Sequence, residues 1–267
     1  MSSLAYTVAD SRTLLRRNLR RLRRYPSMTL LLIGMPIVFL LLFVYVFGGQ
    51  LSHGLSSGLA GGQAGRGGYL NYVTPGILLM TVAATVQGTA IVVAMDMTSG
   101  IIDRFRTMAI ARSAVLTGHV VASLIQTLAS IAVVLGVAVA LGFGPTASAL
   151  DWLGAVGLVT LFAFALIWLA TALGLAAKSV ETASNTPMFL TLLPFLGSGF
   201  VPAGSMPGGL RQFATYQPFT PVTETLRGLL TGTHIGSHAI LAVAWSLAIA
   251  AASYVWAMRL YKRRQPR

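Results

Sequence analysis

Apolar runs of about 20 residues recur along this chain and are separated by short segments that carry most of its charges. A helix of that length spans roughly 30 Å of hydrocarbon, the thickness of a bilayer core. The composition is 55% hydrophobic and 9% charged, against about 25% charged in an average soluble domain. These features predict one all-α polytopic membrane domain.

Six of the apolar runs are expected to cross the membrane as transmembrane helices. The fifth run is short and contains Pro194, Gly197 and Gly199, which predict a broken helix. Pro36 lies inside the first run and predicts a kink there. The six predicted spans cover residues 27–47, 70–95, 114–143, 152–177, 187–201 and 239–258.

The basic residues indicate how these spans are oriented. The formal net charge is +13, which in a soluble protein would suggest a nucleic-acid partner. In a membrane protein, Lys and Arg concentrate in the short cytoplasmic segments beside the spans. With six spans and both termini in the cytoplasm, sixteen of the 19 Lys and Arg residues fall on the cytoplasmic side. We therefore expect this orientation and no nucleic-acid partner.

Three segments outside the spans have patterns of their own. In residues 1–26, apolar side chains recur at helical steps beside arginines, which predicts an amphipathic helix in the cytoplasmic interface; a disordered basic tail is the alternative. Glycine and serine in residues 48–68 predict a flexible outer loop. Between spans five and six, residues 210–216 and 222–230 predict a pair of short outer-face helices that enter the bilayer and return.

A charged stretch, residues 99–110, lies between the second and third apolar runs. Asp103, Arg104 and Arg106 are costly to place in lipid, whereas Phe105 and the neighbouring isoleucines are costly to leave in water. An amphipathic helix along the cytoplasmic face meets both demands, and an ordinary cytoplasmic loop is the alternative. We expect a docked helix at this position.

The signatures of several function classes are missing from the sequence. A P-loop needs Gly-Lys before Ser or Thr, but Lys178 and Lys262 follow Ala and Tyr, so we expect neither an ATPase nor another enzyme. All six acidic residues fall at span ends or in loops, which argues against a mid-membrane ion relay. His234 and His238 have the spacing of a helical metal pair, but no Glu follows the first histidine. We expect no metal and no cofactor in this chain.

Uncharged polar side chains recur at helical steps in the second and third spans. Small and hydroxyl residues favour close packing between membrane helices. The same side chains suit the wall of a translocation path for large, mostly apolar substrates, which need no fixed charge partner. Both interpretations remain open. The candidate path residues are Thr81, Thr85, Gln87, Thr89, Ser123, Gln126, Thr127 and Ser130.

Three stretches resemble a known family, the six-span permeases of type-2 ATP-binding-cassette (ABC) exporters, of the daunorubicin-resistance type found in actinobacteria. The sequence MDMTSGIIDRFRTMAIARSAVL, residues 95–116, is similar to the family's inner segment after span two. Residues 197–232, GSGFVPAGSMPGGLRQFATYQPFTPVTETLRGLLTG, resemble its fifth span and paired outer helices. The Arg-rich N-terminal segment resembles its connecting helix. The resemblance covers essentially the whole chain.

The resemblance implies a role for the charged stretch between spans two and three. In that family the corresponding segment is the coupling helix, which sits in a groove of a separate nucleotide-binding subunit and transmits its ATP-driven closure. Carried over position by position, the expected coupling residues are Gly100, Ile101, Ile102, Asp103, Arg104, Phe105, Arg106, Thr107 and Met108.

The resemblance also implies an assembly and a cargo. The expected complex is a dimer of permeases, from a second copy or a paralogue, with two ABC ATPase subunits that hold ATP and Mg²⁺. It would move an amphipathic or hydrophobic compound, such as a drug, antibiotic or lipid-like molecule, out across the bacterial cytoplasmic membrane. The expected regions are a connecting helix (1–26), a six-span domain (27–258) and a basic tail (259–267).

Other functions remain open at this stage. Within the same family, an exporter of a cell-envelope lipid or polymer competes with a drug exporter. Outside it, the alternatives are a facilitative or ion-coupled carrier that needs no ATPase, and a membrane scaffold or sensor.

Overall fold

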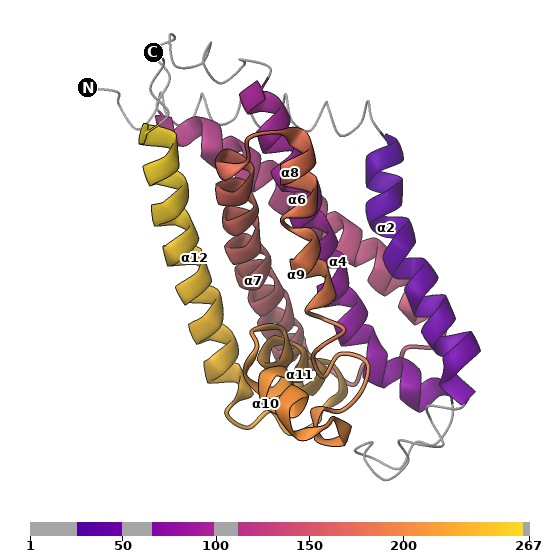
Figure 1. Ribbon diagram of the computed structural model, residues 1–267. Coiled ribbons are helices and arrows are strands. Elements are labelled where there is room, and N and C mark those ends of the chain that lie inside the picture. Colours follow the sequence, from indigo (N-terminus) through magenta and orange to yellow (C-terminus); the bar gives the residue numbers. More distant parts are fainter. Residues whose placement is uncertain (1–25, 50–65, 99–111, 264–267) are drawn as a thin grey trace.

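The structure is a computed structural model that describes residues 26–49, 66–98 and 112–263. In these ranges every regular element is a helix, as the all-α class requires. Figure 1 shows an elongated bundle whose long helices run between the same two ends. The long elements are α2 (Pro26–Leu41) with its π-helical continuation η1 (Leu42–Phe47), α4 (Arg66–Thr98), α6 (Arg112–Ala140), α7 (Ala149–Ala176) and α12 (His238–Arg263).

The two ends of the bundle hold different parts of the chain. At one end, which we call the Pro26 end, α2 begins, α4 ends, α6 begins and α12 ends (Figure 1). The helix ends that flank residues 99–111 therefore lie together with the start of α2 and the end of α12. This grouping agrees with the predicted placement of those segments on one side of the membrane.

Short elements connect α7 with α12. The first of them, α8, lies near the Pro26 end, and the chain then runs along α4 to the opposite end, which we call the α10 end (Figure 1). These elements are α8 (Val180–Asn185), α9 (Met188–Leu192), the 3₁₀ turn η2 (Ala203–Ser205), α10 (Gly208–Tyr216) and α11 (Phe219–Thr231).

Four of the described helices are long and apolar enough to cross a membrane, and Leu32–Phe47 is a shorter apolar helix. Large apolar side chains are exposed on the outside of the bundle, for example Leu30, Leu150 and Ile240, which are 68%, 78% and 75% exposed. Such exposure suits a lipid surrounding better than water. The count of six spans stays a prediction, because the first and fifth predicted spans are this shorter helix and an interrupted segment. The four long spans are Gly67–Thr98, Leu116–Ala140, Ala149–Ala176 and His238–Tyr261.

Helix α4 is the central element of the bundle, because it packs against α2, α6, α7, α8, α9 and α11. Two of its contacts bring backbones together without an intervening side chain. A Cβ at Gly174 of α7 would lie 2.7 Å from the carbonyl oxygen of Ala90, and one at Gly76 would lie 2.6 Å from that of Gly199. Small residues at such crossings permit the close packing on which membrane helix association depends.

The break predicted in the fifth apolar run is confirmed. Helix α9 ends at Leu192, and residues 193–200, which include Pro194 and Gly197, form turns. The two short helices predicted after it are also present as α10 and α11. Helix α10 is largely exposed, whereas α11 is buried against α4, α7 and α12.

The predicted outer loop, residues 48–68, is wrong at both edges. Residues 48–49 are helical and continue η1. Residues 66–68 belong to α4, because the burial of Tyr69 and Leu70 stabilises a helix that continues through two glycines to Arg66. The rest of that loop from residue 50, the predicted connecting helix up to residue 25, and the predicted coupling helix lie outside the described residues.

The Gly174 crossing leads to a test of the packing. Replacing Gly174→Ala is expected to lower the thermal unfolding midpoint of the protein in detergent, because the new methyl group overlaps the Ala90 carbonyl oxygen and Val93. Overpacking of this kind costs about 1–3 kcal/mol. Gly157→Ala in the same helix is the control, since nothing lies within 4 Å of a Cβ there. Equal midpoints for the two variants would contradict the close α4–α7 crossing.

Candidate functional site

The candidate path residues of α4 are buried within the bundle. Thr81, Thr85 and Thr89 are 0%, 2% and 5% exposed. Each hydroxyl donates to a carbonyl of its own helix, at 2.9, 2.7 and 2.9 Å. Hydroxyls bonded in this way are satisfied without water, so they can face apolar neighbours at little cost.

The candidate residues of α6 include one that meets α4 directly. The hydroxyl oxygens of Thr127 and Thr85 lie 2.9 Å apart, and Thr127 also lies 2.8 Å from the Ser123 carbonyl oxygen. Ser130 is 1% exposed, and its hydroxyl has no hydrogen-bond partner among the described residues. Ser123 and Gln126 are half-buried. The structure thus joins the two predicted polar rows at Thr85 and Thr127.

Gln87 faces a different neighbour. Its Nε2 donates to the carbonyl oxygen of Ser184 in α8 at 3.0 Å. This contact connects α4 to the segment that precedes the break, rather than to α6. Within one copy of the chain, the candidate path residues therefore lie mainly at helix contacts; whether any of them lines a path stays a prediction.

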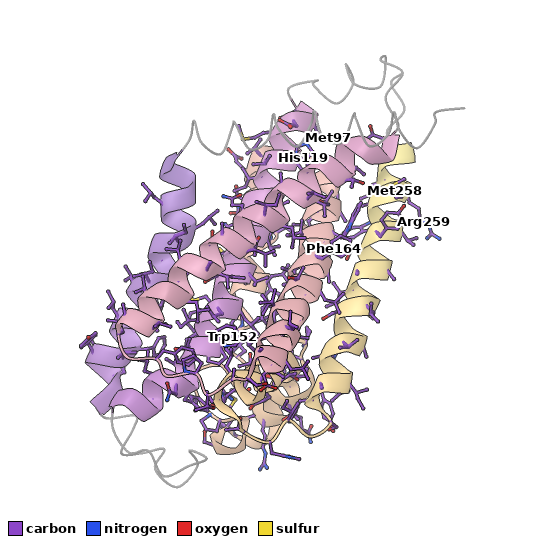
Figure 2. The ribbon with its side chains drawn as sticks, turned by 180° about the vertical axis from the view of Figure 1, so that it is seen from behind. Met97, His119, Trp152, Phe164, Met258 and Arg259 are labelled. Carbon is purple, nitrogen blue, oxygen red and sulfur yellow. The ribbon has the colours of Figure 1, made fainter. Side chains whose placement is uncertain are left out.

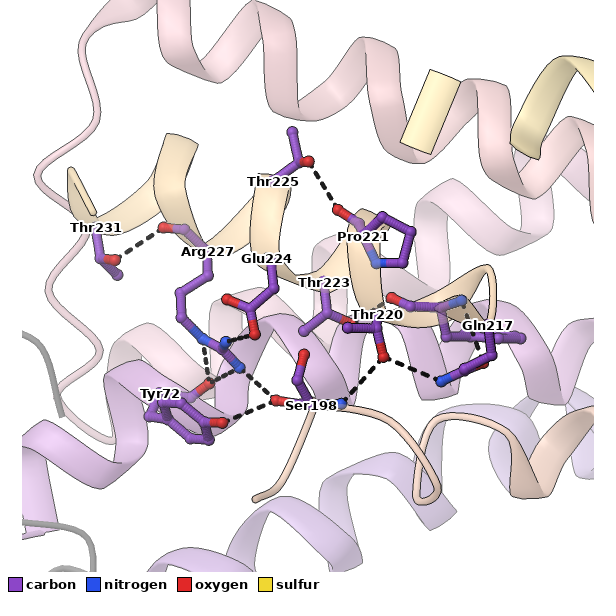
Figure 3. Close-up of polar contacts among 11 residues, drawn as sticks. Tyr72, Ser198, Gln217, Thr220, Pro221, Thr223, Glu224, Thr225, Arg227 and Thr231 are labelled. Carbon is purple, nitrogen blue, oxygen red and sulfur yellow. Dashed lines mark hydrogen bonds and ion pairs between the residues drawn. The ribbon is translucent and has the colours of Figure 1, made fainter. Parts of the chain in front are cut away.

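A second polar cluster lies at the α10 end and was not predicted from the sequence (Figure 3). We define the Arg227 cluster as Tyr72, Ser198, Glu224 and Arg227, which come from α4, the turns after α9, and α11. Arg227 Nη1 lies 2.7 Å from Glu224 Oε1, and Nη2 donates to the Ser198 carbonyl oxygen at 2.9 Å. Nε and Nη2 both donate to the Tyr72 carbonyl oxygen at 3.2 Å.

The Tyr72 side chain completes this arrangement. Its hydroxyl donates to the Ser198 carbonyl oxygen at 2.9 Å, and its ring lies under the Arg227 guanidinium, with Cζ 3.8 Å from the ring centroid. A cation over an aromatic face is attracted by the ring electrons, most strongly where water is excluded. One guanidinium thus holds three chain segments together.

The cluster supplies hydrogen-bond partners for the interrupted segment. Turns in an apolar surrounding leave carbonyl and amide groups without helical partners, and each unsatisfied group costs several kcal/mol. Arg227 and Tyr72 satisfy the Ser198 carbonyl. Gln217 Nε2 donates to the Leu193 carbonyl oxygen at 3.2 Å, and the Ser198 amide donates to the Thr220 hydroxyl at 3.3 Å.

Gly197 allows these side chains to come close to the turn. A Cβ at Gly197 would overlap Gln217 Nε2 and would lie 2.8 Å from Thr220 Oγ1. A larger residue would push both polar side chains away from the backbone groups that they satisfy. The glycine of the broken run is therefore needed for contact as well as for the turn.

An ionisable pair joins α4 and α6 near the Pro26 end. His119 Nε2 lies 3.3 Å from Asp96 Oδ2, and the two side chains are 6% and 3% exposed. Figure 2 shows His119 and Met97 near this end of the bundle, far from Trp152 toward the other. The predicted coupling residues follow two residues after the end of α4, outside the described part of the chain.

Among the described residues there is no group of three or more His, Cys, Asp or Glu side chains that could hold a metal ion. His234 and His238 have the spacing of a metal pair. His234 lies in the segment before α12, and His238 is the first residue of α12. In the Arg227 cluster and the Asp96–His119 pair, the charged groups contact one another or the backbone, an arrangement suited to joining helices. The buried Ser198 hydroxyl has no hydrogen-bond partner among the described residues.

Sequence reasoning missed the Arg227 cluster although a signal was present. Glu224 and Arg227 are three residues apart, a spacing that allows an ion pair on one helix face. They lie in a short helix between apolar segments, where a charged side chain must either reach water or find partners. In the count of Lys and Arg, Arg227 is one of the three residues on the outer side, together with Arg66 and Arg211, and the count gives it no partner.

Comparison with known proteins shows a family match over most of the chain. Residues 10–231 match the family model described as "ABC-2 type transporter". The chain is 26% identical over 261 residues to the daunorubicin resistance ABC transporter permease protein DrrB1 of Streptomyces coeruleorubidus, covering 97% of this chain and 88% of that protein. It is 24% identical over 175 residues to the probable doxorubicin resistance ABC transporter permease protein DrrC of Mycobacterium tuberculosis, covering 64% and 63%.

The Arg227 cluster can be tested by comparing its members. Arg227→Met is expected to destabilise the protein strongly, because Glu224 loses its ion-pair partner and the Tyr72 and Ser198 carbonyls lose the guanidinium, which leaves the Tyr72 hydroxyl as the remaining side-chain donor to Ser198. A buried polar group left unsatisfied costs about 1–3 kcal/mol. Glu224→Gln should cost less, since Glu224 is 28% exposed and Arg227 keeps its other partners. The measurement is the thermal unfolding midpoint in detergent.

Arg211→Met in the exposed helix α10 is the matched control. The predicted order of midpoints, from highest to lowest, is Arg211→Met, Glu224→Gln, Arg227→Met. An Arg227→Met midpoint equal to that of the control would contradict a structural role for the cluster.

Proposed function

The chain belongs to the ABC-2 type transporter family, and from this premise we propose that it is the permease subunit of an exporter driven by a separate ABC ATPase. The observation that carries the proposal is the alignment with a daunorubicin resistance permease over 97% of this chain. The family match of residues 10–231 also includes the predicted coupling residues and the Arg227 cluster. The apolar exterior of the bundle supports a multi-pass membrane protein.

We propose that the ABC ATPase subunit binds at the Pro26 end. The ATPase needs a contact surface on the membrane subunit, and residues 100–108 combine charged and apolar side chains suited to a protein groove. Helices α4 and α6, which flank these residues, end and begin at the Pro26 end (Figure 1). Closure of two ATPases around ATP would then move these helices in each permease copy.

We propose that the transport path forms between two permease copies. One bundle has a core filled by its own side chains, and α4 is covered on most sides by other helices. A second copy or a paralogue would supply the facing wall. The polar side chains at the helix contacts of one copy could become exposed only if these helices separate during the cycle.

The substrate class follows from the relatives and from the chemistry of the spans. The relatives are named for resistance to daunorubicin and doxorubicin. Along α4 the uncharged polar side chains include threonines, Asn71 and Gln87, which offer no fixed charge partner to a substrate. We propose an amphipathic or hydrophobic compound as the cargo, exported from the cytoplasm or the inner leaflet.

Substitutions in the coupling residues test the ATPase contact. Arg104→Ala and Phe105→Ala are expected to lower ATP-dependent export of a fluorescent anthracycline from cells that carry the whole complex, while membrane insertion stays normal. A coupling free energy of about 1–3 kcal/mol corresponds to a factor of about five to a hundred, so we expect the export rate to fall by a factor in this range. Arg66→Ala at the start of α4 is the control, because it lies at the α10 end. Normal export by both coupling variants at equal expression would count against this contact.

Cysteine labelling tests the proposed six-span topology, since the chain has no cysteine of its own. Thr182→Cys and Ser205→Cys are exposed positions on either side of the interrupted segment. If that segment crosses the membrane, a membrane-impermeant maleimide added to intact cells labels Ser205→Cys alone, and both react after permeabilisation. Labelling of both positions in intact cells would contradict six spans with cytoplasmic termini.

A further inference from the structure

Helices α4 and α6 form the two antiparallel arms of a hairpin, and the polar contacts between the arms include two side-chain pairs. The first is the contact between the Thr85 and Thr127 hydroxyls, 2.9 Å apart. The second is the pair between Asp96 and His119, with 3.3 Å between Oδ2 and Nε2. Along α4 the second contact lies about three helical turns closer to the Pro26 end, and along α6 about two turns closer. The arms of the hairpin are therefore fixed to each other at mid-length and near the tip.

The pair near the tip is chemically unusual for this bundle. Asp96 is 2% exposed and is the one buried acidic side chain among the residues that the structure describes. His119, facing it, is 5% exposed. Taking an acid out of water costs several kcal/mol, and replacing such a pair by packed apolar side chains is often neutral or stabilising. The packing of α4 against α6 alone therefore does not require a carboxylate and an imidazole at these positions.

The position of the pair suggests what it does. Asp96 lies two residues before the end of α4 at Thr98, and His119 lies about two turns inside α6, which begins at Arg112. The residues between these helix ends contain the proposed coupling residues 100–108. The pair therefore joins α4 and α6 close to the helix ends that flank the proposed coupling residues.

We propose that the Asp96–His119 pair locks α4 and α6 into one lever, so that the movement of an ATPase bound between them is transmitted along both helices together. Asp96 and His119 are positioning residues in this scheme, and they contact neither ATP nor cargo. Without the pair, the end of α4 and the start of α6 can separate. The movement of the ATPase then pushes the two helices apart and does not move the bundle. The inference rests on the proposed function. It adds the residue pair that makes α4 and α6 respond together to the ATPase.

The experiment uses the complete permease and ATPase complex in proteoliposomes and measures two rates, anthracycline transport and ATP hydrolysis. Asp96→Asn and His119→Gln are expected to keep ATP hydrolysis and to lower the transport per ATP hydrolysed by about five- to tenfold, the lower range of site coupling. A purely structural role would lower both rates together with the amount of folded complex and leave their ratio unchanged. That result would overturn the inference.

An exchange variant and two control variants keep the test independent of folding defects. The exchange Asp96→His with His119→Asp restores the pair with its partners reversed, and it is expected to recover the ratio lost in the single variants. Thr98→Ala and Thr117→Ala are matched controls next to the pair, on an exposed and a half-buried position, and both should keep the wild-type ratio. An exchange variant that folds and stays uncoupled would overturn the inference.

A covalent cross-link can replace the pair, because the chain contains no cysteine of its own. The double variant Asp96→Cys with His119→Cys is expected to transport little per ATP hydrolysed while its thiols are free, and to regain a ratio near wild type once a short bifunctional thiol reagent bridges α4 and α6. A cross-link that forms and leaves transport uncoupled would contradict the lever. Failure of the wild-type complex to transport with ATP would instead contradict the proposed function, which separates the two outcomes.

Discussion

The need to pair every backbone amide and carbonyl inside an apolar surrounding shapes this structure. Long helices such as α4 and α7 meet the need internally, but the segment after α9 does not, because turns replace the helix at residues 193–200. Side chains from α4, from α11 and from the turn between α10 and α11 supply the missing partners, with Arg227 and Tyr72 at the Ser198 carbonyl and Gln217 at the Leu193 carbonyl. The break in the fifth run, the burial of α11 and the position of Arg227 are parts of one arrangement.

The bundle consequently has two ends with different chemistry. At the α10 end, the Arg227 cluster ties α11 and the broken segment to the first turns of α4, so this part of the molecule is held as a unit. At the Pro26 end, the Asp96–His119 pair joins α4 to α6. Helix α4 takes part in both clusters and packs against most other helices. A movement that begins at one end can therefore reach the other along one continuous helix.

The hydropathy pattern and the helix-breaking proline and glycine residues of the sequence predicted much of this fold, because the membrane restricts a chain to long apolar helices. The extents of α4, α6, α7 and α12 agree with the predicted spans to within a few residues, and Pro194 with Gly197 correctly indicated the break. The partners of each helix were not predictable, because periodicity shows which face is polar but not which helix it meets. The contact of Thr85 with Thr127, 42 residues apart, and the burial of Arg227 depend on such neighbours. The family resemblance was confirmed by the match over residues 10–231, whereas the coupling residues stay a prediction.

The central claim is that this permease moves its cargo only when a separate ABC ATPase hydrolyses ATP. The most direct test is uptake of an anthracycline into proteoliposomes that hold either the purified permease alone or the permease with its ATPase. The account predicts uptake against a gradient only with both subunits and ATP-Mg²⁺, and none when vanadate blocks hydrolysis. Uptake by the permease alone, with no nucleotide present, would contradict the account and identify a carrier that works without an ATPase.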